Sequence, residues 1–416
     1  MSVDLLVRDV RLADDAAPLD IAIADDRIAA VGTGLPLDAA RVVEGHGDLV
    51  LPGFVCAHLH LDKTTMDPLL RAPEWNGDKR HLRAVNAKIR AEATVESIVE
   101  RAVPAVESAI RHGTTVLRGF ADIAPGTGLT GIRALVLLRE MYANEIRIEV
   151  CGSPQALISG SEETEALLLE ALEVGSDVVG AMPTEEPTAE LMHRHVDYCF
   201  ELARRYDRDV HLLLDDTDDP SHRALEYVAW RTVQSGWEGR VIAGHAGALA
   251  SYDHAHAATV IGKVADAGIA VCVNAHVSLV LQGRQDRAPV RRGATRVKEL
   301  LAAGVTVLAA QDDMDDPYYT LGRGDALEVA HYAAHVCHLM WPRELEVVRD
   351  FVTYNAARAL RLADYGLDVG CRADLVLCGR PSLRAVLADL PPRRAVIAGG
   401  RLLAESEVVA VRHRRR

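Results

Sequence analysis

Eight short apolar segments rich in β-branched residues recur along this 416-residue chain and constrain its fold more than any other feature. They are residues 54–60, 115–118, 147–150, 177–180, 209–214, 240–243, 269–273 and 305–308. Helical patterns such as 96–111 and 163–172 lie between them. Strands that alternate with helices of about 10–15 residues form a parallel sheet, and eight such units close into a barrel. The sequence therefore predicts an α/β fold, a (β/α)₈ TIM-type barrel over residues 52–364.

The two ends of the chain have a different pattern, with short strand-like segments punctuated by Gly and Asp. Residues 1–51 predict a small antiparallel sheet, and hairpin strands are expected at 373–377 and 394–403. The simplest arrangement joins 1–51 and 365–411 in one small β-sandwich domain formed from both termini. Residues 412–416 form a basic tail, which we expect to be a solvated chain end.

Composition and charge narrow the class of partner. The 60 acidic residues outnumber the 46 basic ones and give a formal net charge of −14, which disfavours nucleic acid because phosphate binding relies on clustered Lys and Arg. No apolar stretch reaches the length of a membrane span, and residues 1–6 lack the pattern of a signal peptide. The seven scattered cysteines form no CxxC pair. We expect a cytoplasmic protein with reduced thiols and a small-molecule substrate.

Polar residues fall where the predicted barrel strands end, and active sites of TIM barrels lie at those ends. His58 and His60, at positions i and i+2 of the first strand, share one face. Two neutral imidazoles on one strand are a ready ligand pair for zinc or iron. His245 ends the sixth strand, and Asp312 follows the eighth. Any one of these residues alone could be a cap or a polar rim, but together they predict a metal site.

Longer motifs then identify a family resemblance. Pro52-Gly53-Phe54 leads into His58-Leu59-His60-Leu61-Asp62-Lys63, and further matching segments are 177–183, 281–284, 291–299, 311–319, 335–340 and 355–360. Together they resemble the cytosine deaminase branch of the amidohydrolase superfamily, nearly end to end. The resemblance implies a metal-dependent hydrolase that cleaves a C–N bond by deaminating a small heterocycle or cyclic amidine. It also implies one divalent metal ion, zinc or iron, and a possible homo-oligomer.

The resemblance assigns roles to particular residues of this chain. His58, His60 and Asp312 match metal ligands, and Asp312 can also accept a proton from water. His245 would act beside the metal-bound water, and Asp216 would carry a proton to the leaving amine. Four residues are implied in substrate binding: Gln155, Asp313, Tyr318 and Phe120.

The fifth strand departs from the family pattern, His-x-Asp-Glu-x-Asp-Asp. Alignment on residues 215–219 puts Leu213 at the position of a metal ligand and Asp216 at that of the glutamate. Leucine binds no metal, and aspartate shortens the reach of the proton-transfer group by one methylene. His211 lies on the same strand face as Leu213 but one pleat deeper, so it replaces the lost ligand only after a register change or bulge. Two interpretations of His211 stay open, a fourth ligand or a histidine of the core.

Two alternatives for the whole protein follow from this departure. The first is a working metal-dependent hydrolase with an altered set of ligands. The second is a barrel with a weakened or lost metal site, redirected to metal-free acid–base chemistry on an unusual substrate such as a specialised metabolite, or to non-catalytic binding of a small molecule. Asp216, Asp312 and Asp313 would repel one another without a cation, and this favours the first alternative.

Overall fold

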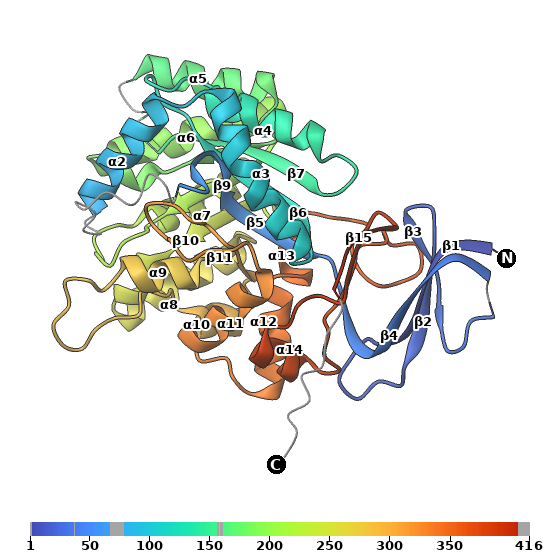
Figure 1. Ribbon diagram of the computed structural model, residues 1–416. Coiled ribbons are helices and arrows are strands. Elements are labelled where there is room, and N and C mark those ends of the chain that lie inside the picture. The colour runs from blue at the N-terminus through green and yellow to red at the C-terminus, as the bar shows by residue number, and fades with distance from the viewer. Residues whose placement is uncertain (1, 37, 67–78, 156–157, 159–160, 407–416) are drawn as a thin grey trace, which may run out of the picture.

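The computed structural model describes residues 2–36, 38–66, 79–155, 158 and 161–406. A barrel surrounded by helices makes up most of the molecule, and the strands of the two chain ends project from one side of it (Figure 1). The predicted basic tail, 412–416, lies outside the described residues. In the described part of the chain, no helix combines the length and the apolar character needed to cross a bilayer.

The eight predicted barrel strands are confirmed. They are β5 (Phe54–His60), β6 (Thr114–Asp122), β7 (Arg147–Ser153), β8 (Val178–Ala181), β9 (Asp209–Leu214), β10 (Val241–His245), β11 (Ala270–Val273) and β12 (Val307–Ala309). Each pairs in parallel with its neighbour in sequence order. Buried residues of these strands join those of the surrounding helices in one large apolar cluster. The fold is therefore a TIM-type barrel with a packed interior.

Helices cover the outside of the barrel. They are α2 (Lys79–Ala91), α3 (Val95–Arg111), α4 (Thr130–Met141), α5 (Glu162–Val174), α6 (Ala189–Tyr206), α7 (Ala224–Ser235), α8 (His254–Asp266), α9 (Ala275–Leu281), α10 (Val297–Ala302), α11 (Ala326–Val336), α12 (Pro342–Phe351) and α13 (Tyr354–Ala359). The two expected helices, 96–111 and 163–172, correspond to α3 and α5. Their first residues follow from local chemistry, because Thr94 and Ser161 accept hydrogen bonds from otherwise unpaired N–H groups of the first turn.

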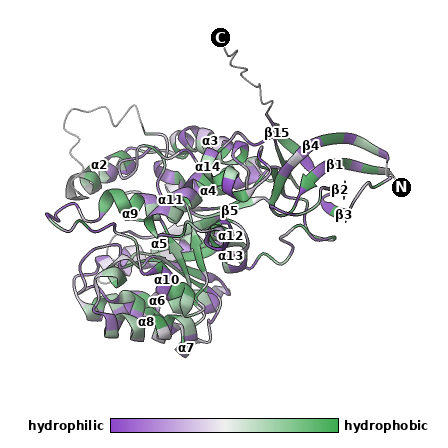
Figure 2. Ribbon diagram, turned by 90° about the horizontal axis from the view of Figure 1, so that it is seen from below, coloured by the Kyte–Doolittle hydropathy of each residue, from purple (hydrophilic) through white to green (hydrophobic). Residues whose placement is uncertain are grey.

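The second unit is a β-sandwich that both chain ends build. Its strands are β1 (Ser2–Arg11), β2 (Leu19–Ala24), β3 (Arg27–Gly32), β4 (Asp38–Pro52), β13 (Leu375–Leu377), β14 (Ala395–Ala398) and β15 (Arg401–Glu405), in the order β15-β14-β13-β4-β1-β2-β3. The long strand β4 pairs with both halves, and apolar residues from both halves form a shared core. Figure 2 shows both hydrophilic and hydrophobic segments along β1 and β4, as expected for strands with one buried face.

Three details of this unit differ from the sequence-based expectation. The N-terminal strands are not wholly antiparallel, because β1 pairs with β4 in parallel. The expected strand at 394–403 is a hairpin of two strands that turns at Gly399 and Gly400, both in the left-handed region with φ of 52° and 74°. A short helix, α14 (Leu383–Asp389), also lies between β13 and β14. The extra helix and the double glycine are local features that strand periodicity does not report.

Candidate active site

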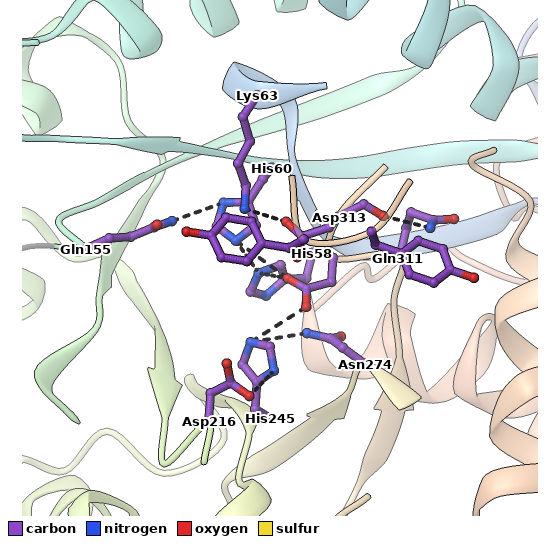
Figure 3. A network of polar contacts seen from close by, with 12 residues as sticks. His58, His60, Lys63, Gln155, Asp216, His245, Asn274, Gln311 and Asp313 are labelled. Atoms are coloured by element: carbon purple, nitrogen blue, oxygen red, sulfur yellow. Dashed lines mark hydrogen bonds and ion pairs between the residues drawn. The ribbon is translucent and has the colours of Figure 1, made fainter. Parts of the chain in front are cut away.

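Three side chains at the C-terminal ends of the first and last barrel strands converge on one point (Figure 3). The Nε2 atoms of His58 and His60 lie 3.3 Å apart. Asp312 Oδ1 is 3.2 Å from the first and 3.5 Å from the second. All three side chains are buried. Two imidazole nitrogens and one carboxylate oxygen therefore face the same small space.

Backbone hydrogen bonds across the barrel seam hold this arrangement. The N–H of Asp312 donates to the carbonyl of His58, and the N–H of His60 donates to the carbonyl of Asp312, both at 2.8 Å. Asp312 has a φ of 61°, a left-handed conformation that non-glycine residues adopt at some energetic cost. The same contacts that close the barrel thus bring the carboxylate to the histidine pair.

The charge states of these three side chains suit a divalent cation. Burial lowers the pKa of His58, and burial with the nearby charge of Lys63 holds the pKa of His60 well below its ordinary value. Burial alone would raise the pKa of Asp312, but His245 and His58 outweigh it and keep that pKa well below the usual range. Asp312 Oδ2 is buried and accepts no hydrogen bond from the described residues. Neutral imidazoles and an ionised carboxylate with a spare oxygen are what zinc or iron requires.

His245 and Asp216 face this cluster from the neighbouring strand ends. His245 Nε2 is 3.9 Å from Asp312 Oδ2 and 3.5 Å from the side-chain nitrogen of Asn274. Its Nδ1 is 3.6 Å from Asp216 Oδ1, which also accepts a 2.7 Å hydrogen bond from Gln282. A carboxylate and an imidazole held side by side at the edge of a cavity are placed to move protons.

The cavity above the cluster has a volume of about 350 Å³, enough for one small heterocycle. Gln155 lines it, and its amide nitrogen is 3.3 Å from His60 Nδ1. Arg90 of α2 reaches into the same cavity, where it forms an ion pair with Asp122 and lies 3.5 Å from the amide oxygen of Gln155. Asp313 and Tyr318, which the resemblance also implies in substrate binding, line the cavity as well.

Lys63 is a buried cation beside Asp313 and Tyr318. Its ammonium group pairs with Asp313, lies 3.5 Å from Asp316 Oδ2, and sits 4.1 Å above the centre of the Tyr318 ring. Burial opposes the charge of Lys63, but the two carboxylates outweigh burial and hold its pKa above the ordinary value. Lys63 thereby neutralises carboxylates that lie close to the cluster of His58, His60 and Asp312.

The fifth strand, β9, supplies no ligand to the cluster. Leu213 lines the cavity and belongs to a small apolar cluster with Cys151 and Val178. His211 lies below it, and its Nε2 is 3.3 Å from His58 Nδ1, the nitrogen that faces away from Asp312. This position argues against His211 as a metal ligand, because the ring of His58 stands between His211 and Asp312. No bulge has carried His211 upward, since β9 pairs with β8 and β10 in regular register.

Phe120 is also placed differently from the implied role in substrate binding. Its ring is fully buried and stacks on the ring of His58, with centroids 4.0 Å apart and an angle of 13° between the planes. It packs against His58 and does not line the cavity.

Sequence reasoning did not assign roles to several residues that the structure brings to the site. They are Lys63, Arg90, Asp122, Asn274 and Gln282. Lys63 and Gln282 lie in motifs that carry the family resemblance, so their position in those motifs was the available signal. Arg90 had none, because its contacts depend on how α2 lies over the barrel.

Comparison with known proteins places the chain in a family. Residues 83–404 match the model of the amidohydrolase family named Amidohydro_3. The chain belongs to the amidohydrolase family. It is accordingly a hydrolase that acts on C–N bonds, and its similarity is to the cytosine deaminase-like members.

Relatives match over nearly the whole length. N-isopropylammelide isopropyl amidohydrolase of Pseudomonas sp. strain ADP is 27% identical over 98% of both chains, and pterin deaminase of Rhizobium rhizogenes is 28% identical over 93% of this chain and 88% of its own. The crystal structure of 5-methylcytosine deaminase from Klebsiella pneumoniae with 5-fluorocytosine superposes with a TM-score of 0.92, at 31% identity over 98% of this chain and 99% of that one. The barrel and the sandwich are therefore shared with 5-methylcytosine deaminase from Klebsiella pneumoniae.

Proposed function

We propose that this protein deaminates a small nitrogen heterocycle or cyclic amidine by hydrolysis, with a divalent metal ion held by His58, His60 and Asp312. The observation that carries the proposal is the convergence of these three buried ligand atoms at the mouth of an amidohydrolase barrel. The names of the relatives give N-isopropylammelide, pterin and 5-methylcytosine as the compounds on which they act. Zinc and iron are the ions that suit two imidazoles and one carboxylate.

A metal ion bound there would lower the pKa of its water toward about 7 and so supply hydroxide at neutral pH. Side chains of the protein bind the substrate and transfer protons. In this proposal Gln155 bonds a ring carbonyl, and His245 polarises the ring carbon that is attacked. Asp216, oriented by Gln282 at 2.7 Å, carries a proton to the departing amine.

The second alternative, metal-free acid–base chemistry, keeps one specific observation in its favour. Leu213 presents an apolar side chain where the family pattern has a ligand, so three protein ligands have to hold the ion. Three protein ligands plus water are an ordinary arrangement for catalytic zinc, and this favours the metal-dependent reaction.

Metal analysis of the purified protein combined with a release assay tests the proposal. Ammonia or amine release is measured with aminopyrimidines, aminotriazines, pterins and cyclic guanidines, before and after chelation and after addition of zinc or iron. We expect one metal ion per chain and activity that chelation removes and metal restores, with Asp312→Asn as the inactive control. Full activity in a protein stripped of metal would refute the metal-dependent proposal and support the second alternative.

We also propose a small-molecule substrate as the main partner, a cytoplasmic location and assembly into a homo-oligomer. Cell fractionation and light scattering of the purified protein test the last two, and a monomer at micromolar concentration would contradict the assembly.

A further inference from the structure

A buried chain of hydrogen-bonding groups connects the lower end of the barrel with the ligand His58. Arg118 of β6 donates from Nε and Nη2 to Glu149 Oε2, at 2.9 and 2.8 Å. Its Nη1 is 3.3 Å from His211 Nδ1, and His211 Nε2 is 3.3 Å from His58 Nδ1. The side chains of Arg118, His211 and His58 are at most 2% exposed, so water does not compete for these contacts.

The chemistry of arginine fixes the direction of this chain. A guanidinium group carries donors and no acceptor, so His211 Nδ1 must accept from it. An imidazole that accepts at Nδ1 carries its proton at Nε2, and His211 therefore donates to His58 Nδ1. By the same reasoning His58 carries its proton at Nε2. That proton points at Asp312 Oδ1, 3.2 Å away.

Metal binding by His58 requires the opposite tautomer. A ligand nitrogen offers its lone pair, so Nε2 has to lose the proton and Nδ1 has to carry one. His211 must then accept at Nε2 and hold its own proton at Nδ1, directly against an N–H of Arg118. One charge-assisted hydrogen bond is lost and two donors are left facing each other in a buried site.

We propose that Arg118, acting through the positioning residue His211, sets the tautomer of His58 and thereby weakens the binding of a divalent cation. The inference rests on the proposed function only in taking His58 as a ligand. It does not depend on Leu213, which lines the cavity. The chain of hydrogen bonds reaches His58 at Nδ1, the nitrogen that faces away from Asp312.

A double-mutant cycle measures the effect. The dissociation constant for Zn²⁺ is determined by competition with a chromophoric chelator for the unaltered protein, Arg118→Met, His211→Leu and the double variant. We expect Arg118→Met to tighten zinc binding at least about tenfold, the effect of one hydrogen bond to a charged group. Arg118→Met also removes a positive charge, which favours binding of a cation by itself. The same substitution in the His211→Leu background measures this charge effect without the coupling through His211. There, Arg118→Met should tighten binding far less.

An equal effect of Arg118→Met in both backgrounds would overturn the inference, because the coupling through His211 would then be absent. His195→Leu is the matched control, since His195 is a fully buried histidine that pairs with Glu186 away from the site. It should lower the melting temperature and leave the zinc affinity unchanged. A change in zinc affinity as large as that expected of Arg118→Met would also count against the inference.

A second measurement needs no variant. Neutron diffraction from metal-free crystals of the unaltered protein should show deuterium on Nε2 of both His211 and His58, and deuterium on Nδ1 of either ring would overturn the inference. The outcomes also separate this inference from the proposed function. Zinc binding by Arg118→Met but not by the unaltered protein supports the inference and refutes the metal-dependent function. Zinc binding by the unaltered protein with no coupling between Arg118 and His211 refutes the inference and supports the metal-dependent function.

Discussion

His276 provides a quantitative test of how the residues around the site are packed. It lies on α9, fully buried, and its Nε2 donates a 2.8 Å hydrogen bond to the carbonyl of Gln311, the residue before Asp312. Its Nδ1 is buried and has no hydrogen-bond partner among the described residues. Burial lowers the pKa of His276 from 6.5 to about 4, although the charge of Asp312 and the Gln311 carbonyl oppose the shift. A proton on Nδ1 would have no acceptor.

The sign and size of the effect on stability follow from this shift. The pKa of His276 is lower in the folded protein than in the unfolded chain, so only the unfolded chain takes up a proton as the pH falls below 6.5. The stability present above pH 6.5 is therefore lost progressively toward pH 4. Each pH unit in this window costs about 1.4 kcal/mol, and the change from pH 7 to pH 5 costs about 2 kcal/mol after both titration curves are included.

Urea denaturation at pH 7 and pH 5 tests this value against the variant His276→Gln. Glutamine keeps a donor for the Gln311 carbonyl and does not titrate. The free energy of unfolding of the unaltered protein should fall by about 2 kcal/mol more than that of the variant over the same change of pH. Other buried histidines contribute to both proteins and cancel in the comparison. Equal losses in the two proteins would refute the reasoning.

Three further predictions concern the site itself. Leu213→His should tighten zinc binding by more than about 100-fold, which is beyond the effect of an outer partner of a ligand. An unchanged dissociation constant in the chelator competition would contradict the alignment of the fifth strand. Asp216→Asn should lower kcat by a factor of about 10²–10⁴ with an unchanged melting temperature. Asp216→Glu keeps the carboxyl group and should retain more activity. Equal losses in the two variants would exclude proton transfer as the role of Asp216. Lys63→Met should destabilise the protein by about 3–5 kcal/mol in urea denaturation, because it leaves Asp313 and Asp316 buried without their cation, and addition of Asp313→Asn should recover part of the loss. No recovery would show that Lys63 acts through packing alone.

The barrel could be predicted because its strands are mostly apolar and regularly spaced. Every one of the eight predicted strands overlaps an observed strand, and β9 (Asp209–Leu214) has the predicted bounds. The parallel pairing of β1 with β4 was not predictable in this way, because residues that alternate in polarity look the same in either direction.

The candidate site was predictable as far as single strands position it. His58 and His60 share a strand face, so their convergence follows from period two, and Asp312 follows from the order of strands in a barrel. The place of His211 depends on depth inside the barrel, and the stacking of Phe120 on His58 depends on the neighbouring strand. Arg90 reaches the cavity only through the way α2 lies across it, which no local pattern encodes.

The seam between β5 and β12 has a consequence for how the protein matures. His58 and His60 are made early and Asp312 late during synthesis, and the three meet only when the N–H groups of His60 and Asp312 close the barrel. An ion that needs all three ligands cannot be bound by a nascent chain or by a barrel that is still open. If these residues bind the ion as proposed, metal uptake would report that the last strand has docked, and the bound ion would in turn tie the first strand to the last.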